Sequence, residues 1–163
     1  MNIVSNASPL INLAWIGQLD LINRLYGQVI IPEAVWNEIV IQGKDQPGSG
    51  EVKKAEWIQV QRVEDQELVK SFRRDLDAGE AEAIALALKT GAELLLIDER
   101  YGREIAALFN IRVTGVIGIL VEAKHKGLIR EVKLNLDRLR MVASFYLNPA
   151  LYERILREEG EIG

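Results

Sequence analysis

Short aliphatic runs that alternate with segments of helical periodicity are the feature that most restricts the fold of this chain. The runs lie at residues 3–5, 29–31, 94–97 and 111–114, with 57–60 as a fifth candidate, placed at an edge of the sheet or between helices. Each run is rich in aliphatic residues and bounded by turn or cap residues, as buried strands are. Strands that alternate with helices form a parallel sheet covered on both faces. We therefore expect an α/β fold.

Helical periodicity fills the intervals between these runs. Helices are expected at residues 9–25, with a break near Gly17, and at 32–40, 77–89, 100–109, 116–126, 134–142 and 149–159. Pro32 suits a first helical turn, and Gly91 suits a C-terminal cap. Residues 42–50 contain three Gly and one Pro, which predicts an exposed, mobile loop. The 163 residues suit one domain, residues 1–163, with helices from about residue 132 packing on it.

Composition excludes several classes of protein. The absence of cysteine excludes a disulfide scaffold, a thiolate zinc site and a Cys nucleophile. The single histidine, His125, argues against zinc enzymes with several His ligands and is expected at the surface. The longest apolar runs, 83–88 and 116–121, fall short of the ~18 residues of a membrane span, and no secretory signal is recognisable. We expect a cytoplasmic protein without membrane contact.

The net charge of −4, from 20 basic and 24 acidic residues, is not the basic footprint typical of nucleic-acid binding. A cluster of acidic metal ligands would, however, contribute several of these negative charges.

Four oxygen-bearing side chains are expected at the carboxyl edge of the sheet, where such folds bind ligands. Asn6 and Asp98 each follow a strand, Glu38 lies two turns into a helix, and Glu80 opens another helix. Converging carboxylates repel and need a cation or shared protons. Oxygen ligands suit Mg²⁺ or Mn²⁺, and two such ions can activate water and stabilise the leaving oxygen of a phosphodiester. The pattern predicts metal-assisted phosphodiester hydrolysis.

The motifs that carry these residues resemble the PIN domain family, the nuclease fold of VapC-type toxins. The likeness is greatest to a compact prokaryotic subfamily with an N-terminal Ser-(Asp/Asn)-x-Ser-Pro-Leu motif. The matching stretches cover nearly the whole chain and are Ser5-Asn6-Ala7-Ser8-Pro9-Leu10-Ile11 and residues 31–38, 77–87, 95–100, 115–120 and 123–129. Each stretch alone is a weak signal, but their order and spacing together are fairly specific.

The resemblance implies a three-layer α/β/α PIN-like fold with a central parallel sheet of four or five strands. It also implies a Mg²⁺/Mn²⁺-dependent endoribonuclease that acts as the toxin of a toxin–antitoxin pair. Its partners would be an RNA substrate, an antitoxin protein and a second copy of the chain in a homodimer.

The resemblance further assigns the ligands. Glu38, Glu80 and Asp98 would be catalytic and would hold the metal together with Asn6, and Glu80 lies 18 residues before Asp98, as the family spacing requires. Glu82 is the alternative to Glu80. At about 100° per residue these two carboxylates point about 200° apart, so both are not expected on one ion.

Asn6 departs from the family pattern, which usually has Asp at this position. Its amide oxygen can ligate Mg²⁺ but brings no negative charge, so we expect weaker metal binding and slower chemistry. RNA contacts are expected from Ser8, Arg100 and Arg103, which lie close to these motifs in the sequence.

Simpler structural roles exist for the same residues. Asp98 could cap the helix that starts near Arg100. Asp77 and Glu80 have the spacing of a capping box, with Asp77 as the cap. Asn6 could bond to the turn that follows it, and Ser8 could cap a helix.

Two other functions compete with the nuclease. The first is a catalytically weak or inactive PIN-fold module that binds nucleic acid or a protein. The second is a phosphotransferase or nucleotide-binding protein, which the absence of both G-x-x-x-x-G-K-[ST] and G-x-G-x-x-G disfavours.

Overall fold

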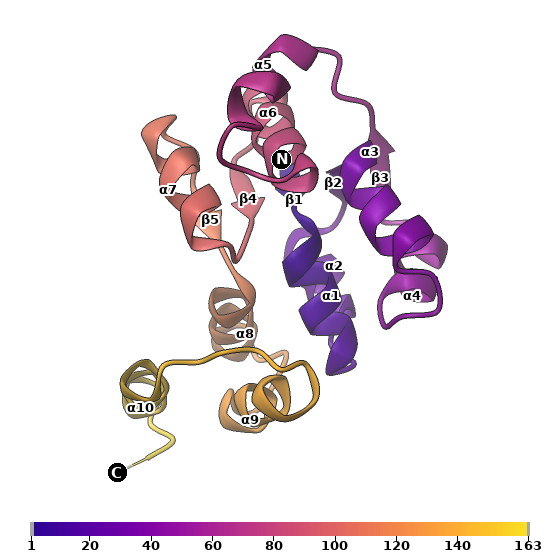
Figure 1. Cartoon of the computed structure of the whole chain (residues 1–163). Coiled ribbons are helices and arrows are strands. Elements are labelled where there is room, and N and C mark those ends of the chain that lie inside the picture. Colours follow the sequence, from indigo (N-terminus) through magenta and orange to yellow (C-terminus); the bar gives the residue numbers. More distant parts are fainter. Residues whose placement is uncertain (1, 163) are drawn as a thin grey trace.

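The aliphatic runs form one parallel sheet in the computed structural model, which describes residues 2–162 (Figure 1). Within those residues the five strands are β1 (Ile3–Ser5), β2 (Val29–Pro32), β3 (Ile58–Gln61), β4 (Leu94–Leu96) and β5 (Val113–Thr114). Their order is β3-β2-β1-β4-β5, and every neighbouring pair is parallel. The predicted strands are confirmed, and of the two placements considered for the fifth candidate the structure has the edge of the sheet.

Helices connect the strands and follow the last one. They are α1 (Ala7–Trp15), α2 (Asp20–Tyr26), α3 (Glu33–Trp36), the π-helix η1 (Asn37–Gln42), α4 (Ser49–Lys54), α5 (Gln66–Phe72), α6 (Ala78–Thr90), α7 (Arg100–Leu108), α8 (Val116–His125), α9 (Lys133–Val142) and α10 (Pro149–Glu158). Helices α4 and α5 were not predicted from the sequence, because six or seven residues are too few to show a clear helical period.

Two local predictions are wrong. Pro32 is not in a helical turn: it is the last residue of β2 and the N-cap of α3, with extended angles of φ −76° and ψ 163°. Residues 42–50 are not one exposed loop, since Gly48 and Ser49 are buried and Ser49 begins α4. The left-handed φ of +97° at Gly48 turns the chain into this helix, a conformation that favours glycine.

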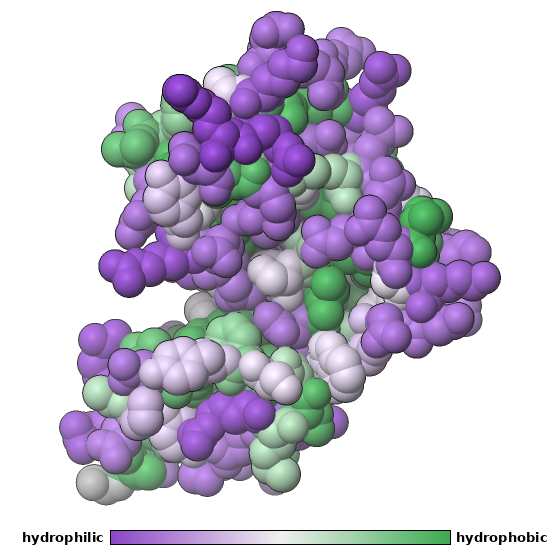
Figure 2. All heavy atoms as spheres, viewed as in Figure 1, coloured by the Kyte–Doolittle hydropathy of each residue, from purple (hydrophilic) through white to green (hydrophobic). Residues whose placement is uncertain are grey.

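Alternate strand residues face two separate apolar layers. Ile3, Ile31 and Leu96 pack with α1, α2, α8 and the C-terminal helices. Val4 and Leu95 point to the opposite layer, which α5, α6 and α7 supply. Both faces of the sheet are therefore covered, as the period of two along each strand requires. This confirms the expected three-layer α/β/α arrangement, and the outer surface over α5 and α6 is mostly hydrophilic (Figure 2).

The chain winds in two directions from the middle of the sheet. From β1 it runs through β2 to β3 at one edge, and afterwards through β4 to β5 at the other. The carboxyl ends of β1 and β4 are therefore neighbours, and the Asn6 backbone N–H donates to the Leu96 carbonyl at 2.8 Å. A reversal of strand order of this kind leaves a crevice in which parallel α/β folds bind their ligands.

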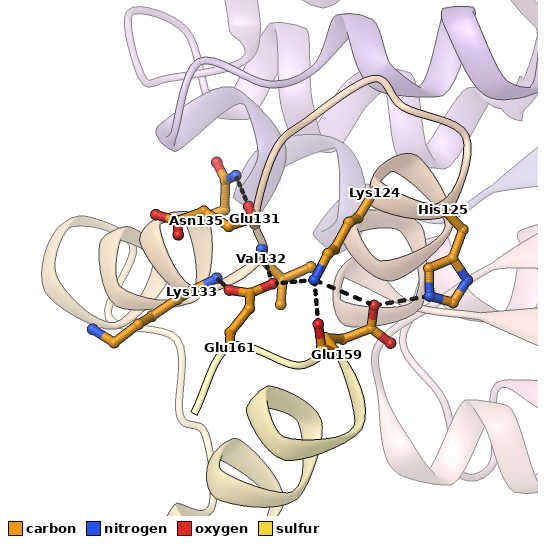
Figure 3. Close-up of polar contacts among 8 residues, drawn as sticks. All are labelled: Lys124, His125, Glu131, Val132, Lys133, Asn135, Glu159 and Glu161. Carbon is orange, nitrogen blue, oxygen red and sulfur yellow. Dashed lines mark hydrogen bonds and ion pairs between the residues drawn. The ribbon is translucent and has the colours of Figure 1, made fainter. Parts of the chain in front are cut away.

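Glu161 fastens the C-terminal segment to α8 and α9 (Figure 3). One of its carboxylate oxygens accepts hydrogen bonds from Lys124 Nζ and the Val132 backbone N–H, and the other accepts from the Lys133 N–H, all at 2.8 Å. The last two donors are at the start of α9, where backbone N–H groups lack helical partners. Lys124 also donates to the Glu159 carbonyl at 2.6 Å. Glu161 thus caps α9 from the far end of the chain.

Replacing Glu161 with Ala is expected to lower the free energy of unfolding by about 2 kcal/mol, since hydrogen bonds to charged groups contribute about 1.5–3 kcal/mol. For a chain of this size that corresponds to a melting temperature lower by about 4–8 °C. Thermal unfolding near neutral pH measures it. Glu158→Ala is the matched control, because that carboxylate is 65% exposed and pairs with Arg154 on the surface.

The effect of Glu161 should also depend on pH. Burial alone would raise the pKa of Glu161, but the bonds from Lys124 and from the two backbone N–H groups outweigh it and hold the pKa below its ordinary value. A lowered pKa stabilises the fold above the unfolded value of about 4.3, and this stabilisation is lost as the pH falls through the lowered pKa. The difference between Glu161→Ala and the unmodified protein should therefore shrink in acid. A difference that persists there would contradict the role given to the charge.

Candidate functional site

Three oxygen-bearing side chains from different parts of the chain surround Gly79, in the first turn of α6. Asn6 follows β1 and is 5% exposed, Glu38 is the second residue of η1, and Asp77 is the N-cap of α6. A Cβ atom at Gly79 would lie 3.1 Å from Glu38 Oε1, 3.4 Å from Asn6 Oδ1 and 3.6 Å from Asp77 Oδ1. These oxygens therefore face one small space, which a larger residue at position 79 would begin to fill.

Glu80 is buried beside this group and is held by the capping box that its spacing predicted. Its N–H donates to Asp77 Oδ1 at 2.8 Å, and the Asp77 N–H donates back to Glu80 Oε1 at 3.4 Å. The other oxygen, Oε2, is directed at α7, 3.4 Å from where a Cβ of Gly102 would lie. Burial and the neighbouring Asp77 carboxylate raise the pKa of Glu80 to about 7.

Asp98 follows β4 and joins the loop to α8. Its Oδ1 accepts a hydrogen bond of 2.8 Å from the Val116 N–H in the first turn of α8. The alternative that Asp98 caps the helix at Arg100 is wrong, because Glu99 is the N-cap of α7. The carboxylate therefore does cap a helix, but one that begins 18 residues further along the chain.

Two buried oxygens at this position have no hydrogen-bond partner among residues 2–162, namely Asp98 Oδ2 and the Ser8 hydroxyl. Burial raises the pKa of Asp98, although the Val116 N–H and the nearby Asn12, Arg103 and Ser8 side chains oppose the rise. Buried polar atoms in native proteins nearly always have a partner. Ser8 and Asn12 lie close enough to Asp98 to lower its pKa, yet Oδ2 makes no hydrogen bond of its own, so it is the oxygen of this carboxylate that remains for a ligand.

Burial disfavours the charged forms of all three carboxylates proposed as metal ligands, and it is the largest cause of their raised pKa values. The charge of Asp77 adds to the rise at Glu38 and Glu80. A bound divalent cation would favour the charged forms, and its preferred ligands are the carboxylate and amide oxygens present here. The chemistry of this donor set thus fits a Mg²⁺ or Mn²⁺ ion.

The predicted ligands are not drawn into a single preformed cage. Among the described residues, no group of three His, Cys, Asp or Glu side chains has metal-binding geometry. One oxygen of Glu80 accepts a hydrogen bond from the Asp77 N–H, and one oxygen of Asp98 accepts from the Val116 N–H. The oxygens of Asn6 and Glu38 instead lie together over Gly79. From the sequence, Asp77 was predicted only as a helix cap. The structure shows that the same carboxylate also borders the Asn6 and Glu38 oxygens.

Several other candidates have clear positions. Glu82 Oε1 accepts from the Ala34 N–H at 3.1 Å, so it holds the start of α3 against α6, as its direction on the helix suggested. Arg103 lies near Asp98, since both Arg103 Nη1 and Asp98 Oδ1 crowd the Cβ position of Gly115. Arg100 is 92% exposed and pairs with Glu104 at 3.3 Å.

His125 is at the surface, as expected, and contacts Glu159 at 2.8 Å (Figure 3). Ser8 lies inside α1, so it is not that helix's cap, and Asn6 makes no side-chain capping bond.

The raised pKa of Glu80 predicts how the metal-free protein responds to pH. A raised pKa stabilises the fold below the unfolded value of about 4.3, and this contribution disappears as the pH rises through about 7. We expect the melting temperature in EDTA to fall between about pH 4.3 and about pH 7 and then to level off, and Mn²⁺ to restore it at the higher pH. Glu80→Gln keeps the capping box and should flatten the profile. An equally steep profile in that variant would contradict the assignment.

Comparison with known families agrees with the geometry. A family model described as PIN domain matches residues 2–161, so the chain belongs to the PIN domain family. PIN domains have a nuclease-type fold and typically use divalent metal ions. A comparison with curated proteins finds no match. Within residues 2–162, no helix is both long and apolar enough to cross a membrane.

Proposed function

We propose that this protein is a Mg²⁺/Mn²⁺-dependent endoribonuclease. The observation that carries the proposal is the buried Asp98 oxygen without a partner, at the point where the strand order reverses. Glu38 and Glu80, whose pKa values are raised by burial and by the neighbouring Asp77, support the same conclusion, because a bound cation would favour their charged forms. Membership of the PIN family makes phosphodiester hydrolysis the reaction that best suits such a site.

The roles of the side chains follow from their contacts. Asp98, Glu80 and Glu38, with Asn6, would hold the metal, which supplies activation of water and stabilisation of the leaving oxygen when bound. The Val116 N–H fixes one oxygen of Asp98 and so orients the other. Arg103, beside Asp98, is suited to bind a substrate phosphate, since a guanidinium matches phosphate geometry.

We also propose that the protein is the toxin of a toxin–antitoxin pair, that it acts in the cytoplasm as a homodimer, and that an antitoxin protein neutralises it. These proposals rest on the family resemblance.

The test is cleavage of a mixed-sequence single-stranded RNA by purified protein in Mn²⁺, Mg²⁺ or EDTA. Cleavage that needs metal and that an identically purified Asp98 variant lacks is the expected result. Equal cleavage by both proteins would mean contamination, and no cleavage by either would contradict the nuclease proposal for this RNA.

A second candidate function is a PIN-fold module that binds nucleic acid or protein without cleaving. The observation that favours it is Asn6, a neutral side chain among the Glu38 and Asp77 carboxylates. RNA binding without metal-dependent cleavage would support this candidate.

A further inference from the structure

A cavity of about 350 Å³ opens beside the candidate metal site, between α1, η1 and the turn that follows. Its walls include Trp15 from α1, Glu38 and Gln42 from η1, and Gln46 from the turn. Glu38 therefore belongs both to the acidic group over Gly79 and to the wall of the cavity. A molecule bound in the cavity would therefore lie next to the candidate metal site.

The backbone shapes this cavity. In the last turn of η1, the Gly43 N–H donates to the Glu38 carbonyl at 2.9 Å, five residues back, which gives a wider turn than an α-helix. A Cβ at Gly43 would lie 2.7 Å from the Ile39 carbonyl oxygen, so this turn needs glycine. At Gly48 a Cβ would lie 3.4 Å from Ala14 Cβ, so the turn folds closely onto α1. The cavity walls are thus set by main-chain packing.

The chemistry of the walls fits a nucleobase. Trp15 is 40% exposed and offers an aromatic ring, with Ile11 one helical turn before it on the same side of α1. Gln42 and Gln46 supply neutral amide groups that can both donate and accept hydrogen bonds. None of the lining residues is Lys or Arg, so a phosphate is not the favoured occupant. An aromatic side chain together with neutral amide groups suits an unpaired base.

We propose that this cavity is a base-recognition subsite of the ribonuclease, in which one unpaired base of the RNA stacks on Trp15. Gln42 and Gln46 would bond to the edge of that base, so the cavity would select which nucleotide lies beside the cleaved bond. This inference rests on the proposed function, because a base in the cavity would lie beside Glu38, one of the proposed metal ligands. Trp15 is then a specificity-determining residue.

The first measurement is the binding of fluorescently labelled single-stranded RNA hexamers of one base each, in EDTA and at low salt so that no cleavage occurs. Stacking on an aromatic side chain accounts for roughly a fivefold to hundredfold change in affinity per base. We expect Trp15→Leu to weaken binding by at least about fivefold for the preferred base, and Trp15→Phe to restore most of it. Tyr146→Leu removes an aromatic ring that is 80% exposed outside the cavity, and it should leave binding unchanged.

The second measurement is the pattern of cut sites on a mixed-sequence RNA in Mn²⁺, together with Mn²⁺ affinity and melting temperature. Trp15→Leu and Gln42→Ala should shift the preferred cut sites while metal affinity and melting temperature stay unchanged.

The outcomes distinguish a failure of the base-recognition subsite from a failure of the proposed ribonuclease activity. If the unmodified protein cleaves RNA but Trp15→Leu has the same affinity and cut sites, the subsite is wrong and the ribonuclease stands. If the unmodified protein neither binds nor cleaves RNA, both are wrong. If a protein partner changes the tryptophan fluorescence of the unmodified protein but not that of Trp15→Leu, and RNA changes neither, the cavity is a protein-docking site and the nucleobase assignment is overturned.

Discussion

Replacing Asp98 with Asn is expected to reduce metal-dependent RNA cleavage by at least about 100-fold and to leave the fold intact, because the change removes a charged metal ligand without removing a cap. The amide oxygen of Asn can still accept the hydrogen bond from the Val116 N–H, so α8 keeps its capping partner. Ala at the same position would lose that bond as well, which would mix a stability effect of about 1 kcal/mol with the catalytic one.

The burial of Asp98 sharpens this test. Its raised pKa shows that the charged carboxylate is unfavourable where it lies, so Asn should melt in EDTA at the same temperature as the unmodified protein or slightly higher. With Mn²⁺ the order should reverse, since only the protein with Asp98 gains the full binding energy of the metal. Asp20→Asn, at the exposed start of α2, is the matched control. Cleavage by Asp98→Asn at the rate of the unmodified protein would remove Asp98 from the site.

The parts of the fold that depend on local patterns could be predicted from the sequence. Strands β1, β2 and β4 are visible in the sequence as short aliphatic runs, and burial on both faces follows from the alternation with helices. The cap at Asp77 and the left-handed Gly91 at the end of α6 are likewise encoded within one turn of the helix. Six- or seven-residue helices such as α4 and α5 carry too little periodicity, and tertiary packing decides whether they form.

The π-helix could not be predicted, although the helical segment that contains it was. Its wide turn depends on Gly43, which closes the hydrogen bond to Glu38, and on a following turn that packs against α1. Gly43 and Gly48 are visible in the sequence, but the packing that requires glycine at these positions is not.

In the candidate site, the spacing of residues along the chain predicted only part of the contacts, because several of them join residues that are far apart in the sequence. The opposite directions of Glu80 and Glu82 followed from helical geometry, and Glu82 does bond elsewhere, to α3. Asp98 caps α8 and not α7. This contact joins residues that are 18 positions apart, so no local sequence pattern could predict it. Asp77 shows the same difficulty, because one carboxylate both caps α6 and faces Glu38, and only the cap has a sequence signature.

Replacing Asn6 with Asp is expected to have opposite effects on stability with and without metal. Asn6 is 5% exposed, and its Oδ1 shares the space over Gly79 with the carboxylates of Glu38 and Asp77. A further buried negative charge there should lower the free energy of unfolding in EDTA by about 2 kcal/mol or more, since unpaired buried charges are strongly unfavourable. Mn²⁺ should recover this loss, because metal affinity rises with the number of charged ligands, by about tenfold or more for one added carboxylate.

Melting temperatures and RNA cleavage rates, each with Mn²⁺ and with EDTA, measure the effect of Asn6→Asp. Asn148→Asp is the control, because Asn148 caps α10 with its side-chain oxygen and Asp is an equally good cap. Tighter Mn²⁺ binding together with faster cleavage would mean that the protein is a nuclease weakened at one ligand. Tighter binding without cleavage would favour the non-catalytic module, since the metal would then be held by a PIN fold that lacks the remaining chemistry. Unchanged stability in EDTA would contradict the geometry itself, because a charge placed between Glu38 and Asp77 cannot be without consequence.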